Sequence, residues 1–432
     1  MIIEFRVENF RSFHEEQTFS LVAGKDEKLP DNLIPVEKFN LLKAAAIFGA
    51  NASGKSNLIK AMMFMKSFVK DSATKMNIGD KIEGITPFRL ASDSPQKPSS
   101  FEMTFMIDKI RYEYGFSATR QRVHDEWLTV YPPPHYRSQG WFERRFNPET
   151  EETNWSFRNP LKSEGKMLKD RTRDNGLVLS RGAELNIEPL KQPFEWYDLG
   201  LLLLDLSQPL FIIDFWTPSR ARKDPSLLNR INQMIPHADV GIDEVKIVKK
   251  MNQGKIPEII SKSSKDKFSE YLAQEYLLDT QTIHRSIDSD SPVLFDMKED
   301  ESNGTQRFFA LLGPILDALD SGMSVVVDEI DASMHPLLVR KLIEMFQSPK
   351  VNAKGAQLIF ATHTVTLMDP ELFRRDQIFL VEKNRNGASE IFSLYDFKDK
   401  PRKTEAFQRN YLAGRYGGIP QFGPTFEDLE IK

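Results

Sequence analysis

The sequence predicts an α/β fold in which a mixed, largely parallel sheet with flanking helices is joined to an antiparallel β-lobe and to an inserted, mostly helical lobe. Two observations carry this expectation. In the last third of the chain, continuous apolar runs alternate with amphipathic helical patterns, which is typical of a covered parallel sheet. Between about residues 85 and 131, aromatic and β-branched segments separated by Asp, Pro or Gly indicate an antiparallel meander.

The N-terminal third supplies the first elements in order. Apolar residues alternate with charged ones over residues 2–8, which predicts a strand with one wet face. Residues 44–48 form a short apolar run, and a glycine-containing loop follows them directly. From residue 55 onward the apolar residues recur at helical spacing. This part of the chain therefore predicts a buried strand, a loop and a helix.

The middle of the chain is less regular. Residues 132–190 are polar and irregular, residues 191–235 have a helical pattern, and residues 252–290 are the best candidate for a linker or mobile insertion. We therefore expect residues 1–131 to form the first half of a nucleotide-binding domain, residues 132–290 an inserted lobe, and residues 291–432 the second half.

Composition excludes several classes of protein. Of the 432 residues, 40% are hydrophobic and 28% charged, which is ordinary for a core-forming chain. Lys and Arg number 58 against 62 Asp and Glu, so no global basic field attracts nucleic acid or anionic lipid. The absence of Cys excludes disulfides, thiolate catalysis and Cys-ligated metals. Neither a signal peptide nor an uninterrupted membrane-spanning run is evident, so we expect a cytoplasmic protein without membrane contact.

The loop after residues 44–48 carries the most specific motif. Gly49 to Ser56 matches G-x-x-x-x-G-K-[ST] at every fixed position, in the required context between a predicted strand and a predicted helix. Backbone N–H groups freed by the glycines would surround the phosphates of ATP, Lys55 would reach the β- and γ-phosphates, and Ser56 would bind Mg²⁺. The predicted ATP-binding residues here are Gly49, Asn51, Ser53, Gly54, Lys55, Ser56 and Asn57.

A matching acidic strand lies far along the chain. Residues 325–327 are valines followed by Asp328 and Glu329. Phosphoryl transfer to water needs one group that holds Mg²⁺ and another that orients the attacking water, roles that suit Asp328 and Glu329 respectively. The separation from Ser56 to Asp328, 272 positions (328 − 56), implies that other lobes are inserted between the two halves of the fold.

Two further segments complete the pattern. Ser302 and Gly304 immediately precede a predicted helix, where they would form either a simple N-cap or a phosphate-binding helix start. His363 follows a predicted core strand, the end at which open α/β sheets bind ligands, although a lone His is usually structural. His335 precedes Pro336 at a helix start and is interpreted as a local cap.

The order of these parts resembles that of ATP-binding-cassette (ABC) ATPases. By that resemblance, the fold is an ABC-type P-loop ATPase head, and Ser302 and Gly304 act as a signature motif on the γ-phosphate bound by the opposite subunit. His363 would be the catalytic switch histidine. Asp331 and Ser333 occupy the positions of the loop that links the two sites. The resemblance thus implies a homo-oligomer whose heads associate through sandwiched ATP.

Finer features resemble the RecF/SMC-like branch of that class. They include VENFRSF at the N-terminus, in which Arg11 resembles a residue placed near the nucleotide. The segments YEYGFSATRQRVHDEWL, HADVGIDEV and YLAGRYGGIP are similar to RloA/AriA-type ATPases of prokaryotic abortive-infection and anti-phage systems. This resemblance implies an ATP-hydrolysing sensor and scaffold that controls a separate toxic, nuclease-like effector protein, with a phage-encoded protein as the trigger.

The sequence departs from the family patterns in two places. A Mg²⁺-sensing Gln cannot be assigned, since Gln96 lies among Pro and Ser residues. OLD-type relatives append a metal-dependent nuclease, whereas 69 residues follow His363 here (432 − 363) and Glu382 is a lone carboxylate on a predicted strand. We therefore expect no nuclease effector within this chain.

Two alternative functions stay open at the level of sequence. One is a RecF-like DNA repair or recombination ATPase that binds DNA between ATP-bound heads, and the other is a scaffold in which ATP is structural and turnover negligible. The first needs phosphate contacts from basic clusters. The candidate clusters are Arg137, Arg144 and Arg145; Arg220, Arg222 and Lys223; and Lys246, Lys249 and Lys250.

Overall fold

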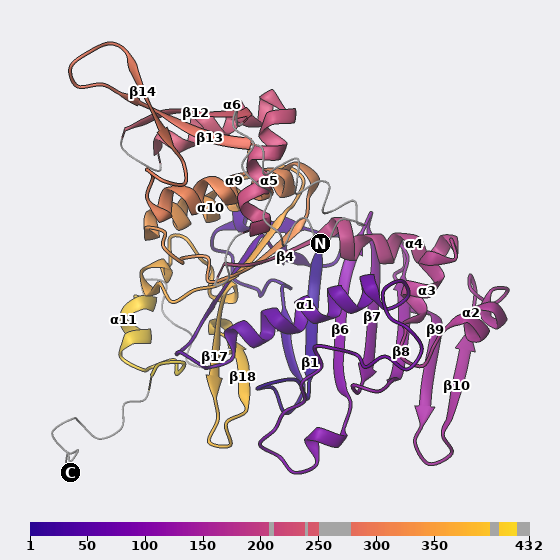
Figure 1. The fold of residues 1–432 in the computed structure, drawn as a ribbon. Coiled ribbons are helices and arrows are strands. Elements are labelled where there is room, and N and C mark those ends of the chain that lie inside the picture. Colours follow the sequence, from indigo (N-terminus) through magenta and orange to yellow (C-terminus); the bar gives the residue numbers. More distant parts are fainter. Residues whose placement is uncertain (207–210, 238–240, 250–277, 398–405, 421–432) are drawn as a thin grey trace, which may run out of the picture. The chain divides into compact units, whose positions relative to one another are not determined.

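A computed structural model describes residues 1–206, 211–237, 241–249, 278–397 and 406–420 (Figure 1). The chain divides into two compact units, and each is described by itself. Unit 1 comprises Met1–Leu204, Gly322–Asp328 and Glu344–Lys432, and unit 2 comprises Asp205–Ser321 and Glu329–Ile343.

The centre of unit 1 is a six-stranded sheet whose strand order is β11-β15-β16-β5-β17-β18. Strands β15, β16, β5 and β17 are parallel, and β18 is antiparallel to β17. Every residue of β5, β15 and β16 is buried, as expected for parallel strands covered on both faces. The predicted mixed, largely parallel sheet is confirmed. Its strands are β5 (Ala44–Phe48), β11 (Leu201–Asp205), β15 (Ser324–Asp328), β16 (Gln357–Ala361), β17 (Ile378–Lys383) and β18 (Ser389–Ser393).

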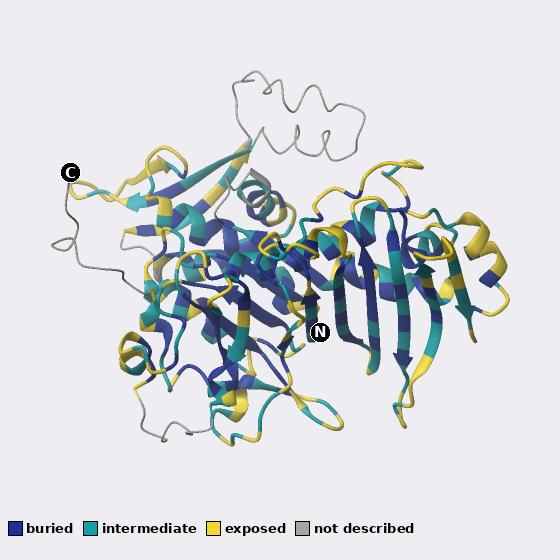
Figure 2. Ribbon diagram, turned by 90° about the horizontal axis from the view of Figure 1, so that it is seen from below, coloured by how far each residue is buried: buried dark blue, intermediate teal, exposed yellow. Residues whose placement is uncertain are grey.

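A seven-stranded antiparallel sheet forms the second layer of unit 1, in the order β10-β9-β8-β7-β6-β1-β2. Buried and partly exposed residues alternate along its strands (Figure 2). One face therefore packs into the core and the other is polar. Rings from this sheet, such as Phe101 and Phe116, pack against Phe64 and Phe68 of helix α1 (Lys55–Asp71). The strands are β1 (Ile2–Glu8), β2 (Gln17–Ser20), β6 (Ser99–Ile107), β7 (Ile110–Ala118), β8 (Val123–Tyr131), β9 (Gln139–Asn147) and β10 (Glu152–Phe157).

The predicted meander is confirmed, but the sheet extends further than expected. Residues 132–190 were predicted to be irregular, and this is wrong, because β9 and β10 continue the antiparallel sheet and short helices follow them. Unit 1 also contains the strands β3 (Leu33–Pro35) and β4 (Asn40–Leu42) and the α-helices α2 (Gly165–Arg171), α3 (Val178–Glu184), α4 (Glu188–Glu195) and α11 (Phe407–Leu412).

Unit 2 combines helices with a small antiparallel sheet. Thr217 of α5 (Phe211–Lys223) fixes this helix against α9 (Asn303–Ser321): its hydroxyl donates to the Ala310 carbonyl at 2.6 Å and accepts from the Gly313 N–H. Asp224 caps α6 (Pro225–Met234) by accepting two backbone N–H groups. The strands, in the order β12-β13-β14, are β12 (Ile242–Lys249), β13 (Leu278–Arg285) and β14 (Pro292–Asp296).

The inserted lobe therefore contains a small sheet beside its helices. Residues 278–285, within the predicted linker, form β13, while residues 250–277 lie outside the described part of the chain. The two units also do not follow the expected boundaries at residues 131 and 290, since unit 1 runs without interruption to Leu204. Helix α10 (Pro336–Gln347) begins in unit 2 and ends in unit 1.

Candidate functional site

The phosphate loop connects β5 to α1 in the predicted context. Gly49 has φ 153° and Gly54 has φ 121°, both values that side-chain-bearing residues rarely adopt. A Cβ on Gly49 would lie 2.3 Å from the Val381 carbonyl oxygen, and one on Gly54 would lie 2.3 Å from the Ser389 hydroxyl. Only glycine fits these two positions, so the motif has a structural cause in the packing of the loop against β17 and β18.

Lys55 is buried and turned back onto its own loop. Its ammonium donates to the carbonyl oxygens of Gly49 at 2.8 Å and Ala50 at 3.1 Å. Ser53 is also buried, and its hydroxyl has no hydrogen-bond partner within the described residues. A buried ammonium and an unsatisfied hydroxyl in a glycine loop at a helix N-terminus are suited to an anion.

Strand order brings the acidic strand to the same sheet edge. Strand β16 lies between β5 and β15, and all three are parallel, so their carboxyl ends share one edge. Asp328 ends β15 and is 2% exposed. Thr362, directly after β16, donates its N–H to the Ile47 carbonyl, and the exposed His363 follows. The phosphate loop, Asp328 and His363 thus lie along one edge of unit 1.

Glu329 follows Asp328 in the chain and is partly exposed. Its φ is 54°, a left-handed conformation that is uncommon for a residue other than glycine. The Glu329 carbonyl accepts from the Ala332 N–H at 2.9 Å, which closes the turn after the strand. Such a conformation at the end of a buried strand is typical of functional sites.

The loop that carries Arg11 lies beside the phosphate loop. The hydroxyl of Ser12 accepts from the side-chain amide of Asn57 at 2.8 Å, and a Cβ on Gly54 would lie 2.9 Å from the same hydroxyl. Arg11 itself is exposed, has φ 52°, and donates its N–H to the Thr86 carbonyl. The structure therefore places Arg11 one residue from a direct contact with the nucleotide loop.

Sequence reasoning missed Ser12 and Ser389. The Ser389 hydroxyl donates to the Ser53 carbonyl at 2.5 Å, and its N–H donates to the Ser12 carbonyl at 2.7 Å. These two serines hold the phosphate loop from outside. No signal in the sequence marks them, because they lie 41 and 336 positions from Ser53 (53 − 12; 389 − 53).

The Ser302–Gly304 segment lies in unit 2, at the start of α9. The Ser302 hydroxyl accepts from the Thr305 N–H at 3.1 Å, so it caps the helix. A Cβ on Gly304 would lie 2.7 Å from the Ser333 carbonyl oxygen. The structure thus brings together Ser302, Gly304 and Ser333, which the sequence singled out separately.

The residue before this segment is held by a second contact. Glu301 accepts from the Thr282 hydroxyl and pairs with His284 Nε2 at 2.8 Å. Both partners lie on β13, so the small sheet of unit 2 fixes the start of α9. The carboxylate is almost fully buried, with its side chain 6% exposed.

The arrangement in unit 1 fits ATP and Mg²⁺. The glycine cradle, the unsatisfied Ser53 hydroxyl and the buried Lys55 suit phosphates. The Ser56 hydroxyl and the Asp328 carboxylate are hard oxygen ligands of the kind that Mg²⁺ prefers. The described residues contain no cluster of three or more His, Asp or Glu side chains that could hold a metal without such a substrate.

Comparison with known families agrees with this geometry. The family model described as an AAA domain, putative AbiEii toxin, Type IV TA system matches residues 44–369, which is three quarters of the chain. The chain belongs to this family. The matched range of this P-loop ATPase begins at β5 and ends just beyond His363, so it contains the phosphate loop, the Ser302–Gly304 segment and the acidic strand.

Among solved structures, this P-loop ATPase is similar to the SMC head domain from Thermotoga maritima. The two share 15% sequence identity with a TM-score of 0.40, and the match covers 91% of this chain and 98% of that chain. No curated protein matches the chain.

Other residues named from the sequence have local roles. His335 Nδ1 accepts from the Leu337 N–H at 3.2 Å, which confirms its interpretation as a cap of α10. Glu382 accepts from the Gly418 N–H at 2.8 Å and so fixes a glycine turn. Gln96 is exposed and ends a single 3₁₀ turn. Within the described part of the chain, no helix is long and apolar enough to span a bilayer.

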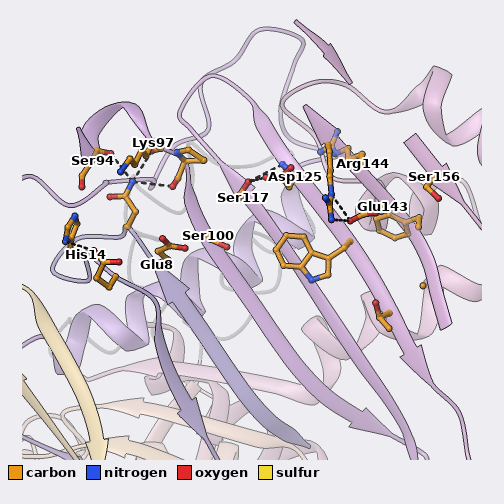
Figure 3. Close-up of a pocket in the computed structure, with 18 of the residues that line it drawn as sticks. Glu8, His14, Ser94, Lys97, Ser100, Ser117, Asp125, Glu143, Arg144 and Ser156 are labelled. Atoms are coloured by element: carbon orange, nitrogen blue, oxygen red, sulfur yellow. Dashed lines mark hydrogen bonds and ion pairs between the residues drawn. The ribbon is translucent and has the colours of Figure 1, made fainter. Parts of the chain in front are cut away.

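The structure removes one candidate contact for DNA. Arg144 is buried and pairs with Glu126 at 3.1 Å on the core side of the antiparallel sheet, so it cannot contact a phosphate backbone. Its neighbour Arg145 donates to the Glu143 carboxylate on the polar face. Both residues line a cavity of about 800 Å³, where Figure 3 labels Glu143. In the other clusters, Arg220 forms an ion pair with Asp317, and the Lys246 ammonium lies 4.0 Å from the Glu244 carboxylate. Lys249 and Lys250 lie outside the described side chains.

Proposed function

We propose that this protein is an ATP-binding and ATP-hydrolysing ABC-type ATPase of the RecF/SMC-like, RloA/AriA-like kind. In this proposal it self-associates through ATP and acts as a sensor and scaffold in anti-phage, abortive-infection defence, where it controls a separate toxic effector. The observation that carries the ATPase part is the shared sheet edge of the phosphate loop, Asp328 and His363. The family description, which includes a Type IV TA system, supports a toxin-linked role.

The residues of unit 1 would bind the triphosphate first. The N–H groups at the start of α1 would donate to the phosphates, and Lys55 would exchange its two loop carbonyls for β- and γ-phosphate oxygens. Ser56 and Asp328 would hold Mg²⁺, which when bound neutralises charge on the phosphates.

Glu329 and His363 would act at the γ-phosphate. Glu329 would orient the attacking water and accept its proton, and His363 would donate to the oxygens of the transferred phosphoryl group. Ser302, capping α9, would contact the γ-phosphate bound by a second copy, in which case one site contains residues from two chains. Hydrolysis would then separate the heads because the shared phosphate is lost.

Steady-state phosphate release tests the catalytic part. In Glu329→Gln we expect ATP affinity to be kept and the hydrolysis rate to fall at least about a hundredfold, the effect of losing a general base. Glu371→Gln, a change at an exposed carboxylate, is the matched control and should leave the rate unchanged. Equal background rates in wild type and Glu329→Gln would instead favour a scaffold with structural ATP.

A phage challenge tests the defence part. Cells that carry the chain with its flanking genes should lose protection when Lys55 is replaced by Ala, while Lys60→Ala, on the next turn of the same helix, should keep it. Equal plaque counts for the wild type, Lys55→Ala and an empty locus would refute the defence role but leave the ATPase proposal standing.

A further inference from the structure

Strand β14, at one edge of the small sheet of unit 2, is an exposed apolar strand. Val293, Leu294 and Phe295 are 41%, 57% and 37% exposed, and Ile287 in the preceding loop is 99% exposed. Within the described residues β14 pairs only with β13, so its other edge carries no strand. Soluble proteins usually protect such edges with charges or cover them, because an unpaired apolar strand is a template for another strand.

Backbone geometry identifies where a strand would pair. The Met297 N–H donates to the Thr280 carbonyl at 2.9 Å, and the antiparallel register pairs Thr282 with Phe295. Because hydrogen-bonding direction alternates along a strand, the N–H and C=O of Leu294 point to the open edge. Pro292 has no N–H, and the Asp296 N–H donates to Asp300 at 2.7 Å. Leu294 is therefore the centre of the available edge.

The side chains around Leu294 are held in place. Cross-strand pairing puts Val293 and Phe295 on the face that carries His284, and Leu294 on the face that carries Ile283. The ring centroids of Phe295 and His284 lie 4.3 Å apart, with an angle of 32° between the ring planes. Since His284 also bonds Glu301, the strand is anchored to the start of α9. An incoming strand would find apolar contacts on both faces without reordering this edge.

Charge at the two ends of β14 selects the partner. Asp288 and Asp290 precede the strand, Asp296 is its last residue, and Glu299 and Asp300 follow it. Lys298 is the only cation from residue 286 to 301, and its ammonium lies 5.0 Å from the ring centroid of Phe215. A second copy of β14 would place acidic ends against acidic ends, in either strand direction, and like charges opposite one another are destabilising.

We infer that β14 binds an extended segment of a partner protein by strand addition, and that this segment has an apolar, β-branched centre flanked on both sides by Lys or Arg. Main-chain hydrogen bonds at Leu294 supply the affinity, and the flanking carboxylates select the basic ends. Because both ends of β14 are acidic, such a segment can bind parallel or antiparallel to it. This surface does not depend on the role assigned to the nucleotide site.

Fluorescence anisotropy with a labelled peptide tests the inference on the full-length chain. The probe is Lys-Lys-Val-Thr-Val-Thr-Val-Lys-Lys, and we expect saturable binding to the wild type. A peptide with Glu in place of Lys, and one with Pro in place of the central Val, should bind at least about tenfold more weakly. Failure of the probe to bind, or equal binding of the Lys and Glu peptides, would overturn the inference.

Protein variants locate the binding edge. Leu294→Pro removes the outward N–H at an edge position where Pro is tolerated, and should weaken the probe about tenfold. Leu294→Thr keeps that N–H, and its affinity for the probe should stay within about threefold of wild type.

Asp288→Lys combined with Asp290→Lys changes only exposed loop charges and should also weaken binding of the probe, so the inference stays testable if Leu294→Pro misfolds. Unchanged binding in this charge variant, or in folded Leu294→Pro, would overturn the inference. So would a drop in the molecular mass of the apoprotein on Leu294→Pro, because a second copy would then occupy the edge.

Discussion

The phosphate loop of unit 1 and the Ser302–Gly304 segment of unit 2 are both small-residue helix starts, yet they are held in different ways. The phosphate loop is held from within by Lys55, whose ammonium donates to the Gly49 and Ala50 carbonyls, and from outside by Ser389, whose hydroxyl donates to the Ser53 carbonyl. The second segment is capped by its own Ser302 hydroxyl, which accepts from the Thr305 N–H.

Distant residues of unit 2 also hold the Ser302–Gly304 segment. Ser333 lies against Gly304, and Glu301 is held by Thr282 and His284 of β13. The phosphate loop carries a buried ammonium suited to phosphates, whereas the Ser302–Gly304 segment has no cation of its own, and we propose that this segment contacts the ATP bound by a second copy. Substitutions in the first should abolish nucleotide binding, whereas substitutions around the second should lower turnover and leave ATP binding by the same chain intact.

The largest effect is expected at Lys55. Lys55→Ala removes a buried ammonium from the phosphates and should weaken ATP binding about a hundredfold, as measured by calorimetry. Lys60→Ala on the same helix should bind ATP normally. Near-normal affinity in Lys55→Ala would show that the loop does not hold the phosphates as described.

A smaller effect is expected at Gly304. A side chain there meets the Ser333 carbonyl, so Gly304→Val should lower ATP hydrolysis about tenfold while ATP affinity is retained. Gly140→Val is the control, because a Cβ at residue 140 meets nothing within 4 Å. If Gly304→Val lost ATP affinity rather than turnover, the two regions would not be separable.

A still smaller effect is expected at Glu301. Glu301→Gln converts charge-assisted hydrogen bonds to Thr282 and His284 into neutral ones, and should lower hydrolysis about threefold. The exposed neighbour Glu299 supplies the control, Glu299→Gln, with an unchanged rate. Identical rates in the two variants would show that the sheet of unit 2 does not position the start of α9.

The smallest effect on ATP chemistry is expected at Lys66 of α1, although stability should change. Burial lowers the pKa of Lys66 to about 8, and its ammonium donates to the Leu201 carbonyl. The folded state therefore disfavours the charged ammonium. Lys66 lowers the free energy of unfolding by its full amount below pH 8, and this destabilisation disappears as pH rises toward 10.5, the ordinary pKa of Lys.

Lys66→Met should consequently be more stable than wild type at pH 7, and the difference should shrink as pH rises from 8 to 10.5. Urea unfolding at several pH values measures this, with ATP affinity unchanged as the internal control. A difference independent of pH over that interval would contradict the assigned cause.

Much of the fold follows from local sequence patterns. The buried strands β5, β15 and β16 are continuous apolar runs, and the phosphate loop is a contiguous motif, so both are predictable without tertiary information. Strand β9 is not predictable in this way, because it contains Arg144 at a core position. That buried guanidinium is tolerated through its ion pair with Glu126 on β8 and its hydrogen bond to the Gly176 carbonyl.

Other parts of the site depend on contacts between distant residues. Ser389 supports Ser53 from 336 positions away (389 − 53), and Ser333 meets Gly304 from a separate segment. Strand β11, with the sequence LLLLD, reads as part of the surrounding helical pattern and becomes a strand because β15 offers a pairing edge. Such contacts are products of the fold and leave no periodicity in the sequence.

Light scattering of purified Glu329→Gln, with and without ATP and Mg²⁺ at fixed protein concentration, tests the central claim most directly. If ATP joins the phosphate loop of one chain to the Ser302–Gly304 segment of another, the molecular mass should double with ATP and return to the lower value on its removal. The double variant Glu329→Gln with Gly304→Val should stay at the lower mass. A mass that ATP leaves unchanged in Glu329→Gln would contradict nucleotide-driven assembly.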